Sequence, residues 1–140
     1  MATLADIQNI SLRHLRDDRG AIHFLEPLRD VPFAAQNIFF IRDVVAHTTR
    51  GEHAHRHTNQ LLCCLAGECT VRCHDGVAEN IFLLHDSTTG LLIPPMIWSR
   101  QHYRDPDTVL LVISDHPFDE TDYLRDFETF LRCAREGCAP

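Results

Sequence analysis

The sequence has no long apolar run and few basic residues, and each shortage excludes a class of protein. The longest apolar stretch, residues 61–66, is far shorter than the roughly 20 residues that a membrane-spanning helix needs. The first six residues lack a basic region followed by an apolar core, so we expect no secretory signal and a cytoplasmic location. The 13 basic residues, all arginine, are outnumbered by 20 acidic ones, and the formal charge is -7. Because nucleic-acid binding favours a basic face, we expect neither a nucleic-acid nor a membrane partner.

The sequence also lacks internal repeats, linkers and Cys-x-x-Cys pairs. Without such pairs its six cysteines indicate no zinc ribbon or redox motif, and we expect them to be reduced and mostly in the core. A chain of 140 residues is long enough to bury one core and too short for two domains. We therefore expect a single domain over residues 1–131, followed by a loose tail over residues 132–140.

Short apolar runs separated by polar turns fill most of the chain. The runs lie at residues 38–41, 60–65, 69–73, 81–84, 90–93 and 109–113. Many short strands without helical periods between them predict an all-β sandwich or barrel. Residues 122–131 differ, because their apolar side chains fall on one face of a helix. They predict one short C-terminal helix.

Histidines are concentrated between His47 and His57, where four of the ten occur. On a strand, His53 and His55 point to the same face, and His57 joins them if the strand continues. Two imidazoles on the inner face of a barrel indicate either a metal site or an acid/base pair. The remaining alternative is a hydrogen-bonded pair without chemistry. A metal would need a further ligand, for which His57 and His102 are the available substitutes.

The histidine spacing is that of a cupin, a double-stranded β-helix that forms a jelly-roll barrel. His53-x-His55 followed by Gln60 corresponds to the first cupin motif, and residues 90–98 correspond to the second. A metal-binding cupin is expected to have a glutamate in place of Gln60 and a third histidine near Ser99. Since a catalytic divalent metal generally takes three protein ligands, this donor set is weak. We expect no metal and no other cofactor.

Several further segments occur in a specific order and spacing along the chain. They are Asp18-Arg19-Gly20, Phe24-Leu25-Glu26, Val31-Pro32-Phe33, Arg50-Gly51-Glu52-His53-Ala54-His55 with Gln60, Ile93-Pro94-Pro95-Met96-Ile97-Trp98, and Phe118-Asp119-Glu120-Thr121-Asp122-Tyr123-Leu124-Arg125-Asp126. With these segments the chain resembles the cupin-fold dTDP-sugar 3,4-ketoisomerases, the WxcM-like family, over about residues 7–131. The resemblance implies a homodimer of β-barrels with exchanged N-terminal strands. It also implies metal-free isomerisation of dTDP-4-keto-6-deoxyglucose, a step in the biosynthesis of deoxyaminosugars for surface polysaccharides or antibiotics.

The resemblance implies that His53 and His55 are the catalytic pair. Moving a carbonyl from C4 to C3 requires a proton to leave C3 and a proton to reach C4 through an enediol. Histidine titrates near neutral pH and can carry out both steps. We expect His55 to be the inner base, and we expect arginines to hold the diphosphate. The residues expected to bind the substrate are Arg19, Arg50, Gln60, Trp98 and Arg100, with core packing as the alternative role for Trp98.

The chain departs from the family pattern at two places. The family usually has tyrosines where this chain has Ile38-Phe39-Phe40-Ile41, and phenylalanine has no hydroxyl to polarise a carbonyl. The family often has arginine directly after the tryptophan, where this chain has Ser99 and then Arg100. Two alternative functions therefore stay open, a metal-dependent cupin or related sugar-nucleotide enzyme and a non-catalytic sugar-nucleotide-binding module.

Overall fold

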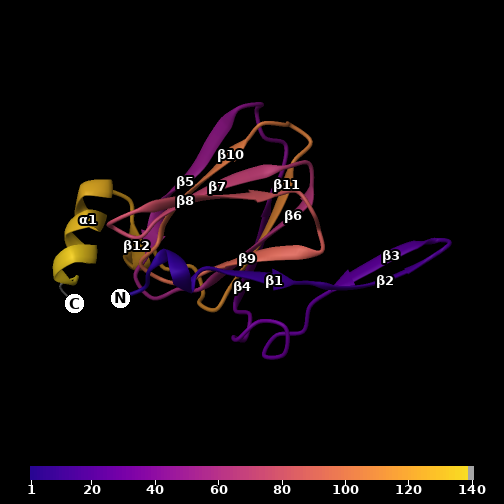
Figure 1. Cartoon of the computed structure of the whole chain (residues 1–140), viewed down its shortest axis with the longest axis horizontal. Coiled ribbons are helices and arrows are strands. Elements are labelled where there is room, and N and C mark those ends of the chain that lie inside the picture. The colour runs from indigo at the N-terminus through magenta and orange to yellow at the C-terminus, as the bar shows by residue number, and fades with distance from the viewer. Residues whose placement is uncertain (139–140) are drawn as a thin grey trace.

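The computed structural model describes residues 1–138 and contains two five-stranded antiparallel sheets that face each other (Figure 1). The first sheet contains, in spatial order, β1 (Gln8–Ser11), β9 (Thr89–Ile93), β6 (Gln60–Ala66), β11 (Val109–Ser114) and β4 (Asn37–Ile41). The second sheet contains β12 (Tyr123–Leu124), β5 (Thr48–His55), β10 (Trp98–Tyr103), β7 (Cys69–His74) and β8 (Glu79–Leu84). The remaining elements are the hairpin β2 (Arg13–Asp17) and β3 (Gly20–Phe24), the 3-10 turns η1 (Leu4–Asp6) and η2 (Glu120–Asp122), and helix α1 (Phe127–Glu136). The prediction of a mostly β fold with one short C-terminal helix is confirmed.

The main core lies between the two sheets, and strand β6 explains why its sequence is continuously apolar. Leu62 and Cys64 face the core between the sheets, whereas Leu61 and Cys63 belong to a second cluster on the outer side of the first sheet. All four side chains are at most 2% exposed. Because both faces of this strand are covered, alternation of apolar and polar residues is lost, as expected for a central strand.

Each of the six apolar runs predicted to be a strand is one. The observed strands β4, β6, β7, β8, β9 and β11 overlap these runs and extend them by one or two residues. Strand β5 carries both His53 and His55 but ends at His55, so His57 lies in the following loop. His57 was expected to join the pair only if the strand continued to it, and the strand does not.

The C-terminal helix begins later and ends later than predicted. Asp126 caps it by accepting a hydrogen bond from the backbone nitrogen of Thr129 at 2.8 Å, and the helix runs from Phe127 to Glu136. The predicted start was wrong because residues 123–124 pair with the edge of β5 instead. The loose tail was also placed too early, since residues 132–136 are helical. Residues 139–140 of the predicted tail lie outside the described residues.

Helix α1 packs on the outer face of the second sheet (Figure 1). Phe130 is fully buried there against Ala54 and Leu124. Cys133 is 8% exposed in the same cluster, so only Cys138 of the six free cysteines is more than slightly exposed. Within the described chain, no helix is long and apolar enough to cross a membrane.

The hairpin β2–β3 projects from the body of the molecule (Figure 1). Its side chains are mostly exposed, including Leu15 and Ile22, which face each other across the two strands and are both 66% exposed. A two-stranded hairpin is at best marginally stable alone in water. The exposed pair of Leu15 and Ile22 therefore indicates that the hairpin packs against another surface.

Candidate active site

A β-bulge in β5 places the functional side chains on one face of the second sheet. Gly51 and Glu52 both have positive φ angles, 85° and 59°, and the pairing with β10 shifts by one residue at this point. Arg50 and His53 consequently lie opposite alternate residues of β10 and share the face that points between the sheets. Glycine is favoured at position 51 because its φ of 85° lies in the left-handed region, and a Cβ there would lie 2.7 Å from the side-chain oxygen of Gln101, which would have to move.

His53 and His55 contact each other directly. Their Nε2 atoms are 3.2 Å apart and their rings meet edge to face at 86°. His53 lines a cavity between the sheets, and His55 lies deeper, 8% exposed. Burial lowers the pKa of His53 to about 4 and also lowers the pKa of His55. Both imidazoles are therefore neutral near pH 7 and able to accept a proton.

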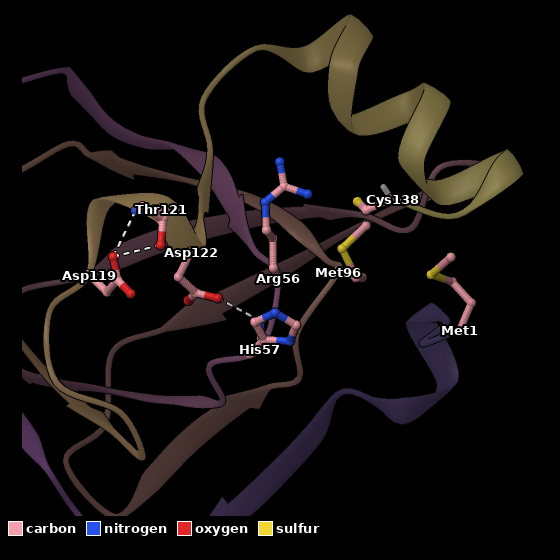
Figure 2. A pocket seen from close by; sticks show the side chains of 8 residues that line it. All are labelled: Met1, Arg56, His57, Met96, Asp119, Thr121, Asp122 and Cys138. Carbon is pink, nitrogen blue, oxygen red and sulfur yellow. Dashed lines mark hydrogen bonds between the residues drawn. The ribbon is translucent and has the colours of Figure 1, made fainter. Parts of the chain in front are cut away.

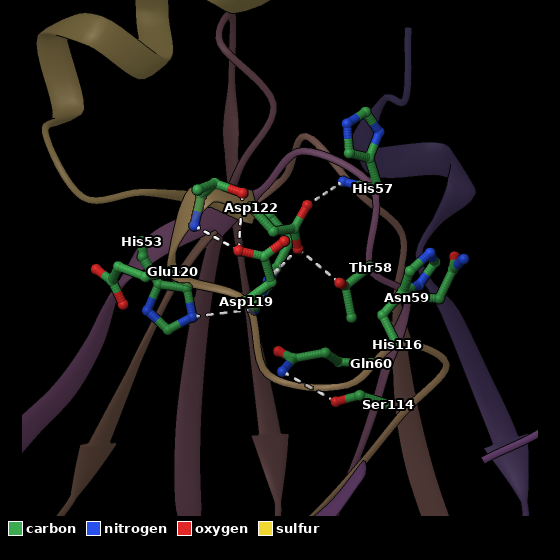
Figure 3. A network of polar contacts seen from close by, with 12 residues as sticks. His53, His57, Thr58, Asn59, Gln60, Ser114, His116, Asp119, Glu120 and Asp122 are labelled. Carbon is green, nitrogen blue, oxygen red and sulfur yellow. Dashed lines mark hydrogen bonds and ion pairs between the residues drawn. The ribbon is translucent and has the colours of Figure 1, made fainter. Parts of the chain in front are cut away.

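A buried carboxylate lies behind the histidine pair. Asp122, at the end of η2, is 8% exposed and accepts three hydrogen bonds (Figure 3). The donors are Nδ1 of His55 at 2.9 Å, the hydroxyl of Thr58 at 2.6 Å and the backbone nitrogen of His57 at 2.7 Å. Burial alone would raise the pKa of Asp122, but the hydrogen bonds from Thr58, His55 and His57 outweigh it and lower the pKa. The carboxylate is therefore ionised.

The cavity in front of His53 has a volume of about 230 Å³. Apart from Gln60, the wall from the first sheet is apolar, whereas the opposite wall is polar. The lining residues are Phe39, Ile41, Arg50, Gly51, His53, Gln60, Leu62, Gln101, Val112, Tyr123 and Arg125. Gln60 is 9% exposed and its amide nitrogen donates to the hydroxyl of Ser114 at 3.3 Å (Figure 3). The structure thus brings the predicted residues Arg50, His53 and Gln60 together.

Two further residues of the cavity were quoted in the sequence only as part of a family segment, without a role. The ring of Tyr123 packs against the rings of His53 and His55, with centroids 4.8 Å and 4.4 Å apart. The guanidinium of Arg125 lies over that ring, 4.3 Å from its centroid, and donates two hydrogen bonds to Glu120 at 2.6 Å and 3.0 Å. The pairing of β12 with β5 brings both residues to the cavity, and no local sequence pattern indicates that pairing.

Three predicted substrate-binding residues lie away from this cavity. Trp98 and Arg100 are on β10 but face outward, because they alternate with the inward-facing Ser99 and Gln101. They line a separate groove of about 480 Å³, where Trp98 packs edge-on against Phe127. Arg19 is at the tip of the hairpin β2–β3, 87% exposed and paired with Asp17 at 2.8 Å.

A larger cavity of about 510 Å³ lies on the other side of Asp122 (Figure 2). Its lining residues are Met1, Arg56, His57, Met96, Asp119, Thr121, Asp122 and Cys138. The side chain of His57 lines this cavity (Figure 2) and not the cavity in front of His53. Asp122 therefore lies between the histidine pair and a second, larger cavity.

The donors around the histidine pair make a poor metal site. Among residues 1–138, no group of three or more histidine, cysteine, aspartate or glutamate side chains is placed to hold a metal ion. Gln60, which stands where a metal-binding cupin is expected to have a glutamate, is a neutral amide that is already bonded to Ser114. His102 faces the outer side of the sheet, where its Nδ1 lies 3.4 Å from the hydroxyl of Thr49.

Comparison with known proteins identifies the family. The profile of the family described as FdtA, WxcM-like, C-terminal, matches residues 5–135. The chain belongs to this family. It is 32% identical over 121 residues to a TDP-4-oxo-6-deoxy-alpha-D-glucose-3,4-oxoisomerase of Aneurinibacillus thermoaerophilus, with 86% of this chain and 87% of the relative covered.

Solved structures of family members superpose closely on this chain. QdtA, a sugar 3,4-ketoisomerase from Thermoanaerobacterium thermosaccharolyticum solved in complex with TDP, has a TM-score of 0.92 and 30% identity, covering 96% of this chain and 98% of QdtA. A 3,4-ketoisomerase from Helicobacter canadensis has a TM-score of 0.90 and 29% identity, covering 94% and 98%. The resemblance stated from the sequence is confirmed.

Proposed function

We propose that this protein is a sugar-nucleotide 3,4-ketoisomerase that converts dTDP-4-keto-6-deoxyglucose into its 3-keto isomer. The observation that carries the proposal is the contact between His53 and His55 at the wall of a cavity. The named relatives support the substrate, since one is a TDP-4-oxo-6-deoxyglucose 3,4-oxoisomerase. A histidine-to-asparagine variant of QdtA has also been solved in complex with TDP-4-keto-6-deoxyglucose.

The reaction requires only proton transfers, which suits the groups present. A base removes the proton from C3 while the C4 oxygen gains one, so an enediol forms between C3 and C4. The C3 hydroxyl then loses its proton as C4 gains one, and the carbonyl is left at C3. His53 faces the cavity, and His55 lies within proton-transfer distance behind it. We therefore assign the contact with substrate to His53 rather than to His55, which reverses the order expected from the sequence.

The remaining lining groups supply donors for the two oxygens that change charge. Tyr123 is a phenol, and burial raises its pKa, so the hydroxyl keeps its proton at neutral pH. It offers the cavity a hydroxyl that Phe39, on the opposite wall, does not. Donors placed where negative charge develops stabilise an enediolate.

The size of the cavity indicates how the sugar nucleotide lies. At about 230 Å³ it is smaller than the roughly 300–1,000 Å³ pockets that enclose a drug-sized ligand. We therefore assign the cavity to the sugar, with the diphosphate and nucleoside further out. Arg50 lines the cavity, and no side-chain ion pair engages its guanidinium among the described residues, so it is free to pair with a phosphate.

We also propose a type of β fold and an oligomeric state for the protein. We assign the two facing sheets to a cupin jelly-roll barrel, in agreement with the histidine motif. We also propose a homodimer in which N-terminal strands are exchanged. The projecting hairpin β2–β3 supports this, as does an apolar groove of about 390 Å³ that includes Leu12, Phe24 and Leu111. In such a dimer the hairpin would place Arg19, at its tip, against the partner subunit and not near the cavity of its own subunit.

Incubation with dTDP-4-keto-6-deoxyglucose in deuterated water, followed by NMR, tests the function. We expect a 3-keto product, with the isotope at C4 showing whether the transferred proton exchanges with solvent. Binding of TDP without any 3-keto product would instead favour a non-catalytic binding module. Analytical ultracentrifugation tests the dimer, whose expected mass is twice the chain mass of 16.0 kDa.

A further inference from the structure

We infer that Asp122 is a positioning residue for the isomerisation, which holds His55 in one tautomer and stabilises its protonated form. The inference rests on the proposed function, because it assigns a role within that reaction. Asp122 does not line the sugar cavity, and it contacts the histidine pair only through His55.

The carboxylate of Asp122 is held in one orientation. Oδ1 accepts from the backbone nitrogen of His57, and Oδ2 accepts from Thr58 and faces Nδ1 of His55. Both backbone segments involved are fixed, since the backbone nitrogen of Arg56 also donates to the carbonyl of Asp122 at 2.8 Å. An ionised carboxylate accepts hydrogen bonds and donates none, so Nδ1 of His55 carries the hydrogen.

This tautomer determines the protonation of the whole pair. With its hydrogen on Nδ1, neutral His55 has an unprotonated Nε2, which faces Nε2 of His53 at 3.2 Å. His53 therefore donates its own Nε2 hydrogen across this contact, which leaves its Nδ1, without a hydrogen-bond partner, as the nitrogen that can accept the proton from C3 of the sugar. As Nδ1 takes that proton, the Nε2 hydrogen moves to Nε2 of His55. His55 then becomes an imidazolium ion beside the Asp122 carboxylate, and the charge of the pair is balanced. When C4 is protonated, Nδ1 of His53 gives up its hydrogen while a hydrogen returns from His55 to Nε2 of His53, so the pair gains and loses no proton overall.

Substitution of Asp122 by asparagine tests the inference, because it removes the charge and keeps the shape. We expect kcat of Asp122→Asn to fall about a hundredfold, the scale on which an acid/base group and its orienting carboxylate act, while affinity for TDP stays within about threefold. Asp119→Asn is the matched control. It removes a carboxylate from the same turn, keeps a capping side chain for Thr121, and does not contact His55. We expect its kcat to be unchanged.

A double-mutant cycle separates positioning from a general structural effect. If Asp122 acts through His55, adding Asp122→Asn to His55→Asn lowers kcat by no more than about threefold. A further hundredfold loss in the double variant would overturn the inference, as would near wild-type kcat in Asp122→Asn or a loss in Asp119→Asn as large as in Asp122→Asn.

A measurement that does not depend on activity can test the role of Asp122 separately from the proposed function. The ¹⁵N chemical shifts of the His55 ring at neutral pH should show the hydrogen on Nδ1 in the wild-type protein. A ring protonated on Nε2 alone would overturn the inference even if the enzyme is active. If no 3-keto product forms with any variant, the proposed function fails, and the tautomer alone decides whether Asp122 orients His55.

Discussion

The two faces of the sheet that contains β5 and β10 carry similar residue types with different surroundings. The inner face presents Arg50, His53 and Tyr123 to a cavity closed by the opposite sheet. The outer face presents an arginine, a histidine and a tryptophan to a groove partly covered by α1, and these are Arg100, His74 and Trp98. Composition alone would make either face a candidate for binding a sugar nucleotide.

The difference between the two faces lies in burial and in partners. On the inner face, burial lowers the pKa of His53, and its Nε2 contacts a second histidine. On the outer face, Nδ1 of His74 accepts from the backbone of Gly76 at 2.9 Å, and its ring packs against Phe127. A histidine becomes a catalytic base when it is desolvated and has a proton partner. The comparison therefore predicts that function follows the inner face.

The largest effect is expected for the histidines. Replacing His53 by asparagine should lower turnover of dTDP-4-keto-6-deoxyglucose by about a hundredfold or more, because the proton acceptor is lost. His102→Asn, on the outer face of the same sheet, should retain wild-type turnover in the same NMR assay. Comparable losses in both variants would mean that turnover does not depend on the inner face.

Burial of His53 should also make stability depend on pH. Its pKa of about 4 in the folded protein lies below 6.5, so the unfolded chain binds the proton more readily. The charged groups facing it are Arg125 and Glu120, besides the partner His55. The free energy of unfolding is then greatest above pH 6.5 and falls by about 3 kcal/mol as the pH drops to about 4. Urea titrations should show a smaller decrease in His53→Asn, and an equal decrease would contradict the burial argument.

The arginines should differ in their effect on nucleotide binding. Arg50→Ala should weaken TDP binding by about 1.5–3 kcal/mol, the usual contribution of a charge-assisted hydrogen bond. Arg100→Ala should change it by less than about 0.5 kcal/mol, as for a surface substitution outside a site. Titration calorimetry of both variants decides this, and the opposite order would place the nucleotide on the outer face.

The phenol of Tyr123 should make a smaller contribution. We expect Tyr123→Phe to lower kcat about tenfold without weakening TDP binding, because the ring packing stays and only one donor to the reacting oxygens is removed. Trp98→Phe on the outer face should leave kcat unchanged. Wild-type kcat in Tyr123→Phe would show that another group protonates the oxygen.

The smallest effect is expected from metal removal. Two neutral imidazoles and an amide are a weak donor set, so activity should be the same before and after treatment with a chelator. One tightly bound metal ion per chain, found by elemental analysis, with activity lost on chelation and restored by the metal, would instead favour the metal-dependent alternative.

Much of the fold and half of the site could be predicted from local patterns. The six apolar runs are strands, and alternation along β5 correctly put His53 and His55 on one face. The bulge at Gly51 could not be predicted from alternation, which would have pointed Arg50 to the other face. The resemblance supplied Arg50 as a candidate, and it also supplied Trp98 and Arg100, which the structure places elsewhere.

The sequence by itself determined the class of the fold, the family and the histidine pair, because strand periodicity and motif spacing are local properties of the chain. Only the tertiary structure decided which histidine meets the cavity, and only it brought Asp122 and Tyr123 to that pair. Those two residues lie 67 and 68 positions beyond His55 in the chain. The residues around them fit a helix as well as a strand, and pairing with the free edge of β5 decided between the two.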